Sequence, residues 1–430
     1  MKLVINNVGR VSSADIVLGG ITVLAGANGT GKSTVSRSLM TISSISRRIN
    51  SLILAERGKS IVATLQEAFK KVGGDIFYTD QSFGGRNGSW LQCLNVAWWS
   101  DAGKIVEWLK EHNRQEVMVF PTGFLDRPAC LEAIEEARPK IVEALNRSDD
   151  EYVAYICRKL FKKAFNGQLS PVFDSGTASL ISVEDDEKTD SRISVDFSGG
   201  EVKSYREIGR TYYPSVVYFE PLNFVDFVNN IEEPISDRYS AGGLCSCFVV
   251  QKEPPKDISL EEQKELDDAN EIVQEIVANI HGRLIKDNAD IKFNETFSTG
   301  TSLIDVKNIA SGMKTMAAIV RAVENRSVRR GSLIIIDEPE SNLHPEWQVS
   351  FARFLVSLSK RLDVSLLLNT HSPYFLQAIR VCSKQMDVAS RYYNMEPTGC
   401  GDAYATADVT DDIDRVFRTM SKPFNDLIGS

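Results

Sequence analysis

A glycine-rich segment near the beginning of the sequence carries the most specific chemistry. Residues 26–33 match the phosphate-binding pattern G-x-x-x-x-G-K-[ST], after the apolar run 21–25 and before a helical pattern. In that setting backbone N–H groups wrap a phosphate chain and a helix N-terminus faces it. We expect Lys32 to contact the β and γ phosphates of ATP and the Ser33 hydroxyl to bind Mg²⁺. The expected nucleotide-binding residues of this segment are Gly26, Ala27, Asn28, Gly29, Thr30, Gly31, Lys32, Ser33 and Thr34.

A second segment supplies carboxylates. The apolar strand pattern of residues 333–336 runs directly into Asp337 and Glu338. At the end of a strand beside a phosphate-binding loop, Asp337 would hold Mg²⁺ and Glu338 would polarise the attacking water. Together the two segments predict hydrolysis of ATP to ADP and phosphate, with ATP and Mg²⁺ as the bound groups.

Two shorter motifs complete the set. Ser311 and Gly312 begin a helical pattern whose first N–H groups can hold a phosphate. His371 follows the apolar strand pattern 365–369, which would place it at the carboxyl edge of the sheet near the γ-phosphate. Each motif alone is typical of an ordinary helix cap or strand end. The order of all four motifs along the chain favours a nucleotide site.

This set of motifs resembles the ATP-binding-cassette type of ATPase head found in RecF, SMC and OLD-family proteins. The string from Asp337 to Pro345 and the string Asn369-Thr370-His371-Ser372-Pro373 are most similar to OLD-like ATPases of anti-phage and mobile-element systems. In that family two heads dimerise with nucleotide between them. The resemblance implies that Ser311 and Gly312 of one subunit contact the γ-phosphate held by the loop of the other, and that His371 senses that phosphate.

The sequence also departs from the family pattern. The signature is a reduced Ala-Ser-Gly-Met-Lys, and neither Gln66 nor Gln92 has a convincing strand before it as a Q-loop glutamine would. About 60 residues follow His371, fewer than a fused TOPRIM nuclease needs, and the four histidines give no support for an HNH or zinc centre. We therefore expect a separate effector protein, a nuclease, as partner.

The elements that must position these motifs predict an α/β fold: an ABC-type P-loop ATPase head with a mixed sheet, antiparallel N-terminal strands and a helical insertion. Helical patterns cover residues 33–47 and 53–71, and Ser259 and Glu262 stand in capping-box spacing before a helix to about Ile285. The predicted division is 1–44 for the first part of the head, 45–190 for a mainly helical insertion, 191–220 for strands returning to the head, 221–300 for a charged linker and helix, and 301–430 for the second part of the head.

Composition limits the partners. The chain has 430 residues, with 49 Lys and Arg against 58 Asp and Glu, which gives a net charge of −9. An acidic chain does not coat nucleic acid by bulk charge, so any such contact would need a local basic patch. Apolar runs such as residues 332–336 are far shorter than the roughly 18 residues of a membrane span. Seven scattered cysteines favour a cytoplasmic location.

Three functional hypotheses remain. The first is an ATPase that dimerises around ATP and acts as the sensor or regulatory subunit of an anti-phage defence complex, similar to the PtuA-type or AriA-type ATPase subunits. The second is a DNA-repair ATPase similar to RecF, which would bind DNA in a salt-dependent way. The third is a scaffold that binds ATP with little turnover, which the intact Asp337 and Glu338 pair disfavours.

Overall fold

The computed structural model describes residues 1–73, 99–112, 123–174, 176–185, 191–209, 213–219, 259–287, 290–399 and 401–428. These residues form two compact units. The first contains residues 1–47 and the described residues from 160 onward, and the second contains the described residues of 48–159. Most of the predicted charged linker, residues 221–258, lies outside the described residues.

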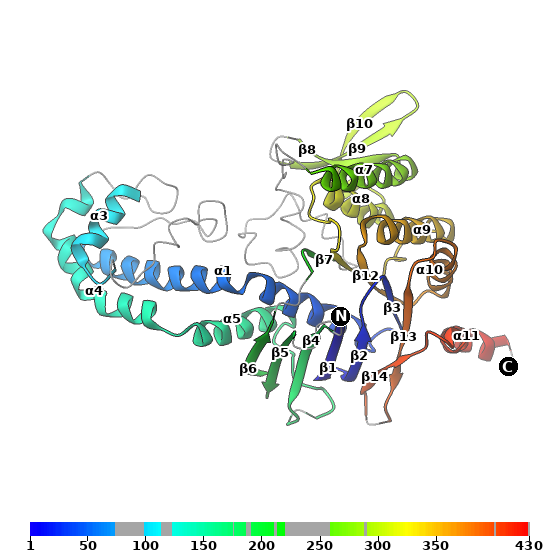
Figure 1. Cartoon of the computed structure of the whole chain (residues 1–430), viewed down its shortest axis with the longest axis horizontal. Coiled ribbons are helices and arrows are strands. Elements are labelled where there is room, and N and C mark those ends of the chain that lie inside the picture. The colour runs from blue at the N-terminus through cyan, green and yellow to red at the C-terminus, as the bar shows by residue number, and fades with distance from the viewer. Residues whose placement is uncertain are drawn as a thin grey trace. The chain divides into compact units, whose positions relative to one another are not determined.

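The described part of the first unit contains a mixed sheet of eleven strands, in the order β6-β5-β4-β1-β2-β14-β13-β3-β12-β11-β7 (Figure 1). This is the mixed sheet predicted for an ATPase head. Its strands are β1 (Lys2–Val8), β2 (Val11–Val17), β3 (Ile21–Ala25), β4 (Ser179–Glu184), β5 (Arg192–Ser198), β6 (Glu201–Ile208), β7 (Val216–Phe219), β11 (Leu333–Asp337), β12 (Ser365–Thr370), β13 (Ser390–Pro397) and β14 (Tyr404–Asp408).

The half of the sheet that carries the motifs is parallel. β11 pairs in parallel with β7 and β12, and β3 pairs in parallel with β12 and β13. Every residue of β3 and β11 is buried, as expected for parallel strands covered on both faces. Because carboxyl ends of neighbouring parallel strands share one edge, the segments after β3, β11 and β12 meet there.

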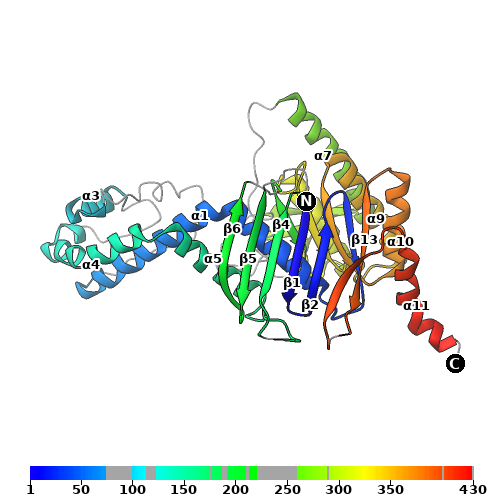
Figure 2. The same cartoon turned by 60° about the horizontal axis from the view of Figure 1, so that its bottom comes forward.

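The other half of the sheet is antiparallel, which confirms the prediction for the N-terminal strands. β1 pairs antiparallel with β2 and with β4, and the ladder continues through β5 to β6. Figure 2 shows these five strands side by side. In β2 buried residues alternate with more exposed ones, the pattern of a strand with one face toward a core.

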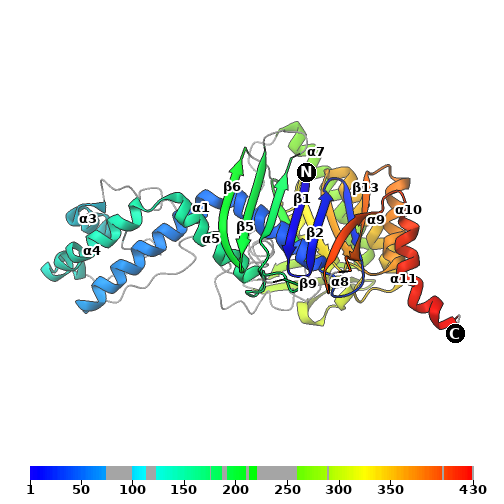
Figure 3. The same cartoon turned by 90° about the horizontal axis from the view of Figure 1, so that it is seen from below.

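Five helices of the first unit contribute to one hydrophobic core with β3, β11 and β12. Figure 3 shows α9 and α10 beside the sheet and α11 beyond them. Both α9 and α10 carry proline in the first turn, where its missing N–H costs no hydrogen bond. The helices are α7 (Leu260–Ile280), α8 (Ser311–Glu324), α9 (Pro345–Leu362), α10 (Pro373–Gln385) and α11 (Ile413–Ile428).

The end of α7 differs from the prediction. The capping box of Ser259 and Glu262 is present as predicted, but the helix ends at Ile280 instead of continuing to Ile285. His281 adopts a left-handed conformation with φ of 51°, which stops the helix, and the next residues form a strand. This strand belongs to a three-stranded antiparallel sheet of β8 (Gly282–Asp287), β9 (Asp290–Phe297) and β10 (Gly300–Asp305).

The second unit is helical. α1 (Lys32–Lys71) begins in the first unit and ends in the second as one helix, where the sequence pattern predicted two. Residues 48–52 contain neither proline nor glycine, so nothing interrupts the helical hydrogen bonds there. The core of this unit packs around Phe69, Trp99 and Trp108. The other helices that contribute to the unit are α3 (Ala102–His112), α4 (Pro128–Asn146) and α5 (Asp149–Ala164).

The predicted insertion, residues 45–190, is longer than the second unit. β4 and the segment before it belong to the first unit, in which β4 pairs with β1. No described helix combines the length and hydrophobicity that crossing a membrane requires.

Candidate active site

The glycine-rich loop connects β3 to α1 and requires glycine at two points. Gly26 and Gly31 have φ of 154° and 100°, which residues with a side chain rarely adopt. A Cβ at Gly31 would lie 2.8 Å from Val11 Cγ2, and one at Gly26 would lie 2.9 Å from Met395 Cβ. The backbone therefore passes too close to β2 and β13 for any other residue.

Lys32 begins α1 and folds back over the loop. Its Nζ donates hydrogen bonds of 2.8 Å to the carbonyl oxygens of Gly26 and Ala27. Burial lowers the pKa of Lys32, while the carboxylates of Glu338, Glu340 and Asp337 oppose this by favouring the charged form. The ammonium group thus stands at a helix N-terminus with the acidic segment after β11 in its electrostatic range.

The loop borders a cavity of about 360 Å³. The turn between β1 and β2 forms another part of its wall and is bonded to the segment after α5, since Gly9 N donates to Leu169 O and Val172 N donates to Gly9 O. The cavity is lined by Gly9, Arg10, Asn28, Gly29, Gly31, Lys32, Ser33, Thr34, Arg37, Phe165, Gln168, Val172, Asp337, Glu338 and Asn369.

Asp337 is buried at the end of β11, and three elements hold its carboxylate. Oδ1 accepts hydrogen bonds from Ser36 Oγ at 2.7 Å and from Asn369 Nδ2 at 2.6 Å. Oδ2 accepts a hydrogen bond from Tyr218 OH at 2.8 Å. Since Ser36 lies on α1, Asn369 on β12 and Tyr218 on β7, the carboxylate has one orientation fixed by the fold.

Glu338 has a backbone conformation unusual for its type. Its φ is 50°, in the left-handed region, and its N–H donates to Asn369 O at 2.8 Å. The carboxylate is partly exposed, with Oε2 accepting from Ser341 Oγ at 3.0 Å. The turn therefore leaves the Glu338 side chain in the cavity wall while Asp337 stays buried.

His371 follows β12 and approaches both glutamates of the acidic segment. Its Nδ1 lies 3.4 Å from Glu340 Oε1 and 4.0 Å from Glu338 Oε1. The structure thus brings His371, which the sequence predicted from its position after a strand, next to the predicted catalytic glutamate.

The signature residues Ser311 and Gly312 lie elsewhere, at the start of α8, and do not line this cavity. Gly312 packs against the loop that follows the acidic segment: a Cβ there would lie 2.6 Å from Asn342 O and 2.6 Å from Leu343 Cδ2. Within this chain, the glycine is required by packing. Its predicted contact with the γ-phosphate of a second subunit stays a prediction.

Sequence reasoning missed several residues of the site. Ser36 and Tyr218 carry no motif of their own and meet the site only through the fold. Glu340 stands in the string from Asp337 to Pro345, but no role was predicted for it. Gln168, in the turn after α5, lines the cavity and was not among the predicted site residues. Gln66 lies in the helical second unit, and Gln92 lies outside the described residues.

The residues present fit Mg²⁺ and ATP. Asp337 and Ser33 offer the hard oxygen ligands that Mg²⁺ prefers, beside loop glycines that can approach a phosphate chain. Asn369 is 1% exposed, and its Oδ1 is buried with no hydrogen-bond partner among the described residues. An orphaned acceptor in the cavity wall is suited to a metal-bound water.

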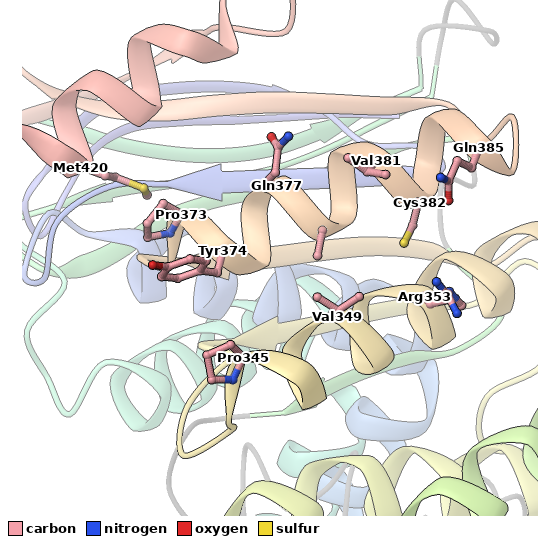
Figure 4. A pocket seen from close by; sticks show the side chains of 11 residues that line it. Pro345, Val349, Arg353, Pro373, Tyr374, Gln377, Val381, Cys382, Gln385 and Met420 are labelled. Atoms are coloured by element: carbon pink, nitrogen blue, oxygen red, sulfur yellow. The ribbon is translucent and has the colours of Figure 1, made fainter.

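A second hollow, of about 780 Å³, lies between α9 and α10 (Figure 4). Val349, Tyr374 and Val381 are exposed along it, with Arg353 at its edge. None of the glycine-rich loop residues lines it. It is larger than the cavity at the loop but has no group suited to phosphate chemistry beyond Arg353.

Comparison with known proteins gives a family match over part of the chain. Residues 248–377 match the AAA_21 family model, described as "AAA domain, putative AbiEii toxin, Type IV TA system". No curated protein sequence matches.

Three solved structures illustrate the structural similarity. They are an SMC head domain from Thermotoga maritima (TM-score 0.39, 11% identity, 95% of this chain and 98% of that chain covered), an SmcHead bound to the C-winged helix domain of ScpA (0.43, 10%, 96% and 98%), and an Smc head domain with an extended coiled coil bound to the C-terminal domain of ScpA derived from Pyrococcus furiosus (0.38, 10%, 98% and 98%).

The topology itself defines the class. A glycine-rich loop lies between β3 and α1, and two carboxylates stand at the end of β11, which is separated from β3 by the parallel strand β12. With the antiparallel strands of the same sheet, these features make the fold that of an ABC-type P-loop ATPase head. The fold class predicted from the sequence is confirmed.

Proposed function

We propose that this protein is a Mg²⁺-dependent ATPase that hydrolyses ATP to ADP and phosphate. One observation carries the proposal: Asp337 and Glu338, from the end of β11, line the same cavity as Lys32 and Ser33 of the phosphate-binding loop. The carboxylates are far from that loop in sequence. Ser36, which follows the loop in α1, donates a hydrogen bond to Asp337, and these two residues are 301 positions apart. This combination of a phosphate-binding loop with two carboxylates is the one that ATP hydrolysis uses.

Each residue then has a role in the reaction. The loop amides and Lys32 bind the phosphates, while Ser33 and Asp337 hold Mg²⁺, which when bound neutralises charge on the phosphate oxygens. Glu338 accepts a proton from water as the water oxygen bonds to the γ-phosphorus and the bond to the β–γ bridging oxygen breaks. Ser341 donates to Glu338 Oε2 and so restricts the orientation of this base.

We also propose that two heads close around ATP. Ser311 and Gly312, predicted to contact the γ-phosphate, do not line the cavity of their own chain, so a second copy would have to supply them. A helix N-terminus, such as that of α8, is suited to this contact because its first N–H groups point outward along the axis.

For the cellular role, we propose a sensor or regulatory subunit of a cytoplasmic anti-phage defence complex whose effector, a nuclease, is a separate chain. The OLD-like motifs support this role, and the matching family model is described by a toxin of a type IV toxin–antitoxin system. We also propose that any contact with nucleic acid uses a local basic patch, because a chain with a net charge of −9 does not attract nucleic acid as a whole.

Phosphate release tests the activity. With ATP and Mg²⁺, wild-type protein should turn over, and Glu338→Gln should retain ATP binding while losing at least about a hundredfold in kcat, the scale of a positioned general base. Glu346, exposed in the first turn of α9, gives the matched control Glu346→Gln, which should turn over like wild type. Equal rates for wild type and Glu338→Gln would contradict the proposal and favour an ATP-binding scaffold.

Association tests the assembly. Glu338→Gln with ATP and Mg²⁺ should trap a dimer in light scattering, and Ser311→Arg should prevent it. Co-purification from the native host should recover a nuclease chain. Tight, salt-dependent binding of DNA by the head alone, without such a chain, would favour the RecF-like alternative instead.

A further inference from the structure

Glu340 is a buried carboxylate that the proposed hydrolysis does not use. It is 5% exposed and follows Glu338 by two residues in the acidic segment after β11. Burying an ionisable side chain is costly unless it is hydrogen-bonded, so its partners indicate what it does.

The hydrogen-bond donors to the Glu340 carboxylate among the described residues lie at the end of β12 and directly after it. Oε1 accepts from Thr370 Oγ1 at 2.8 Å, from His371 N at 2.9 Å and from Ser372 N at 3.1 Å. Hydrogen bonds to a charged acceptor are stronger than those between neutral groups. Glu340 thus fixes the backbone on both sides of the His371 side chain, at the point where Ser372 caps α10.

The imidazole itself also faces this carboxylate. His371 Nδ1 lies 3.4 Å from Glu340 Oε1, nearer than the 4.0 Å to Glu338 Oε1. Glu340 Oε2 is buried without a hydrogen-bond partner among the described residues, so after a small ring rotation it could accept a hydrogen bond from the N–H at Nδ1. The His371 side chain is 41% exposed, so part of the imidazole is accessible to a bound molecule.

We propose that Glu340 is a positioning residue for His371: it keeps Nδ1 protonated and directed at the buried carboxylate, so that Nε2 is presented to the γ-phosphate or the attacking water. The inference rests on the proposed ATPase function. The arrangement is that of a carboxylate orienting a histidine, in which the carboxylate sets which ring nitrogen carries the proton.

A double-mutant cycle tests the coupling in the full-length protein. Glu340→Gln should lose about tenfold or more in kcat with ATP affinity within about twofold, since an orienting partner acts on turnover more than on binding. If Glu340 acts through His371, the double variant Glu340→Gln with His371→Gln should be no slower than His371→Gln alone. Glu346→Gln is again the matched control. Multiplicative losses in the double variant would overturn the proposal.

A spectroscopic measurement separates this inference from the proposed activity. With ¹⁵N-labelled histidine in nucleotide-free protein at about pH 8, where an unperturbed imidazole is neutral, Nδ1 of His371 should carry a proton in wild type and lose it to Nε2 in Glu340→Gln. His371→Gln assigns the signal among the four histidines. Protonation of Nε2 alone in wild type would overturn the inference even if hydrolysis is confirmed. This measurement is made on the wild-type protein, so it does not depend on whether a variant folds. An inactive wild type with a protonated Nδ1 would refute only the ATPase proposal.

Discussion

At the scale of single residues, the site depends on how Asp337 is held. Its two oxygens accept from three uncharged donors, on Ser36, Asn369 and Tyr218, and all three donors are buried. Uncharged donors fix the carboxylate without neutralising it. These donors bring no positive charge to the site, as a salt bridge to lysine or arginine would have done, so they leave room for a cation beside the carboxylate.

Removing one of these donors should weaken Mg²⁺ use. Tyr218→Phe deletes the 2.8 Å hydrogen bond to Oδ2 and keeps the buried ring. We expect the Mg²⁺ concentration for half-maximal hydrolysis to rise about tenfold or more, consistent with roughly 1.5 kcal/mol or more for a hydrogen bond to a charged group. A Mg²⁺ titration of phosphate release at saturating ATP measures it.

The control for this prediction is Tyr205→Phe, which removes the hydroxyl that donates to Glu207 on β6 at 2.7 Å. It should leave the Mg²⁺ titration unchanged. A similar shift in both variants, or none in Tyr218→Phe, would show that Tyr218 does not support the metal site.

How much of the site the sequence could predict depends on whether a residue acts through local spacing. The loop from Gly26 to Thr34, Asp337 and Glu338 were predicted because their chemistry requires neighbours in sequence, and eight of them line one cavity. Tyr218 and Ser36 escaped prediction because they reach Asp337 across the sheet and from α1. Such contacts leave no periodic or spacing signal in a single sequence.

At the scale of elements, α8 couples the signature to the acidic segment through packing. Gly312 Cα lies against the backbone of Asn342, in the loop that follows Glu338 and Glu340. Backbone cannot swing away as a side-chain end can, so an added methyl group must displace the helix or the loop.

Gly312→Ala should therefore lower the stability of the first unit by about 1–3 kcal/mol, the usual cost of overpacking, even though alanine favours helix. Thermal unfolding followed by circular dichroism would measure it. Ser311→Ala, one residue earlier in α8, is the matched control for stability and should change the melting temperature much less, because Ser311 is only half-buried. An unchanged melting temperature in Gly312→Ala would contradict the prediction, because it would show that packing does not require glycine at position 312.

Helices and strands were predicted best where one face or both faces of the element are buried. The apolar runs of β3, β11 and β12 gave the parallel strands because continuous burial needs continuous hydrophobicity. The ends of helices were harder. The left-handed position that ends α7 is usually occupied by glycine, but here it is occupied by His281. No glycine therefore marks this position in the sequence.

At the scale of the whole molecule, each of the two units contains a buried acidic group whose pKa is raised by burial. Burial raises the pKa of Tyr213 in the first unit to about 12, from 10.0, against a hydrogen bond with Ser365 that lowers it. Burial also raises the pKa of the Cys157 thiol in the second unit to about 12, from 9.0. Both groups are thus neutral in the folded protein over a range in which they ionise in the unfolded chain.

The sign of the pH dependence follows from linkage. A group that holds its proton more tightly when folded contributes stability that is fully present below the unfolded pKa and is lost as pH rises toward the folded pKa. For Tyr213 the loss runs from about pH 10 to about pH 12 and amounts to about 3 kcal/mol. For Cys157 it begins near pH 9.

Alkaline unfolding of the nucleotide-free protein should show this loss, and Tyr213→Phe isolates one contribution to it. The variant lacks the hydroxyl, so it should start less stable by the lost Ser365 hydrogen bond yet fall less steeply above pH 10. Urea unfolding at about pH 9 and at about pH 11, followed by tyrosine and tryptophan fluorescence, gives the free energy of unfolding at both pH values. The difference between the two values is the slope of stability against pH for each protein. Because lysines and other tyrosines titrate equally in both proteins, only the difference between the slopes reports Tyr213. Parallel slopes would mean that the Tyr213 hydroxyl reaches solvent before the first unit unfolds, and so that β7 and its neighbours open locally.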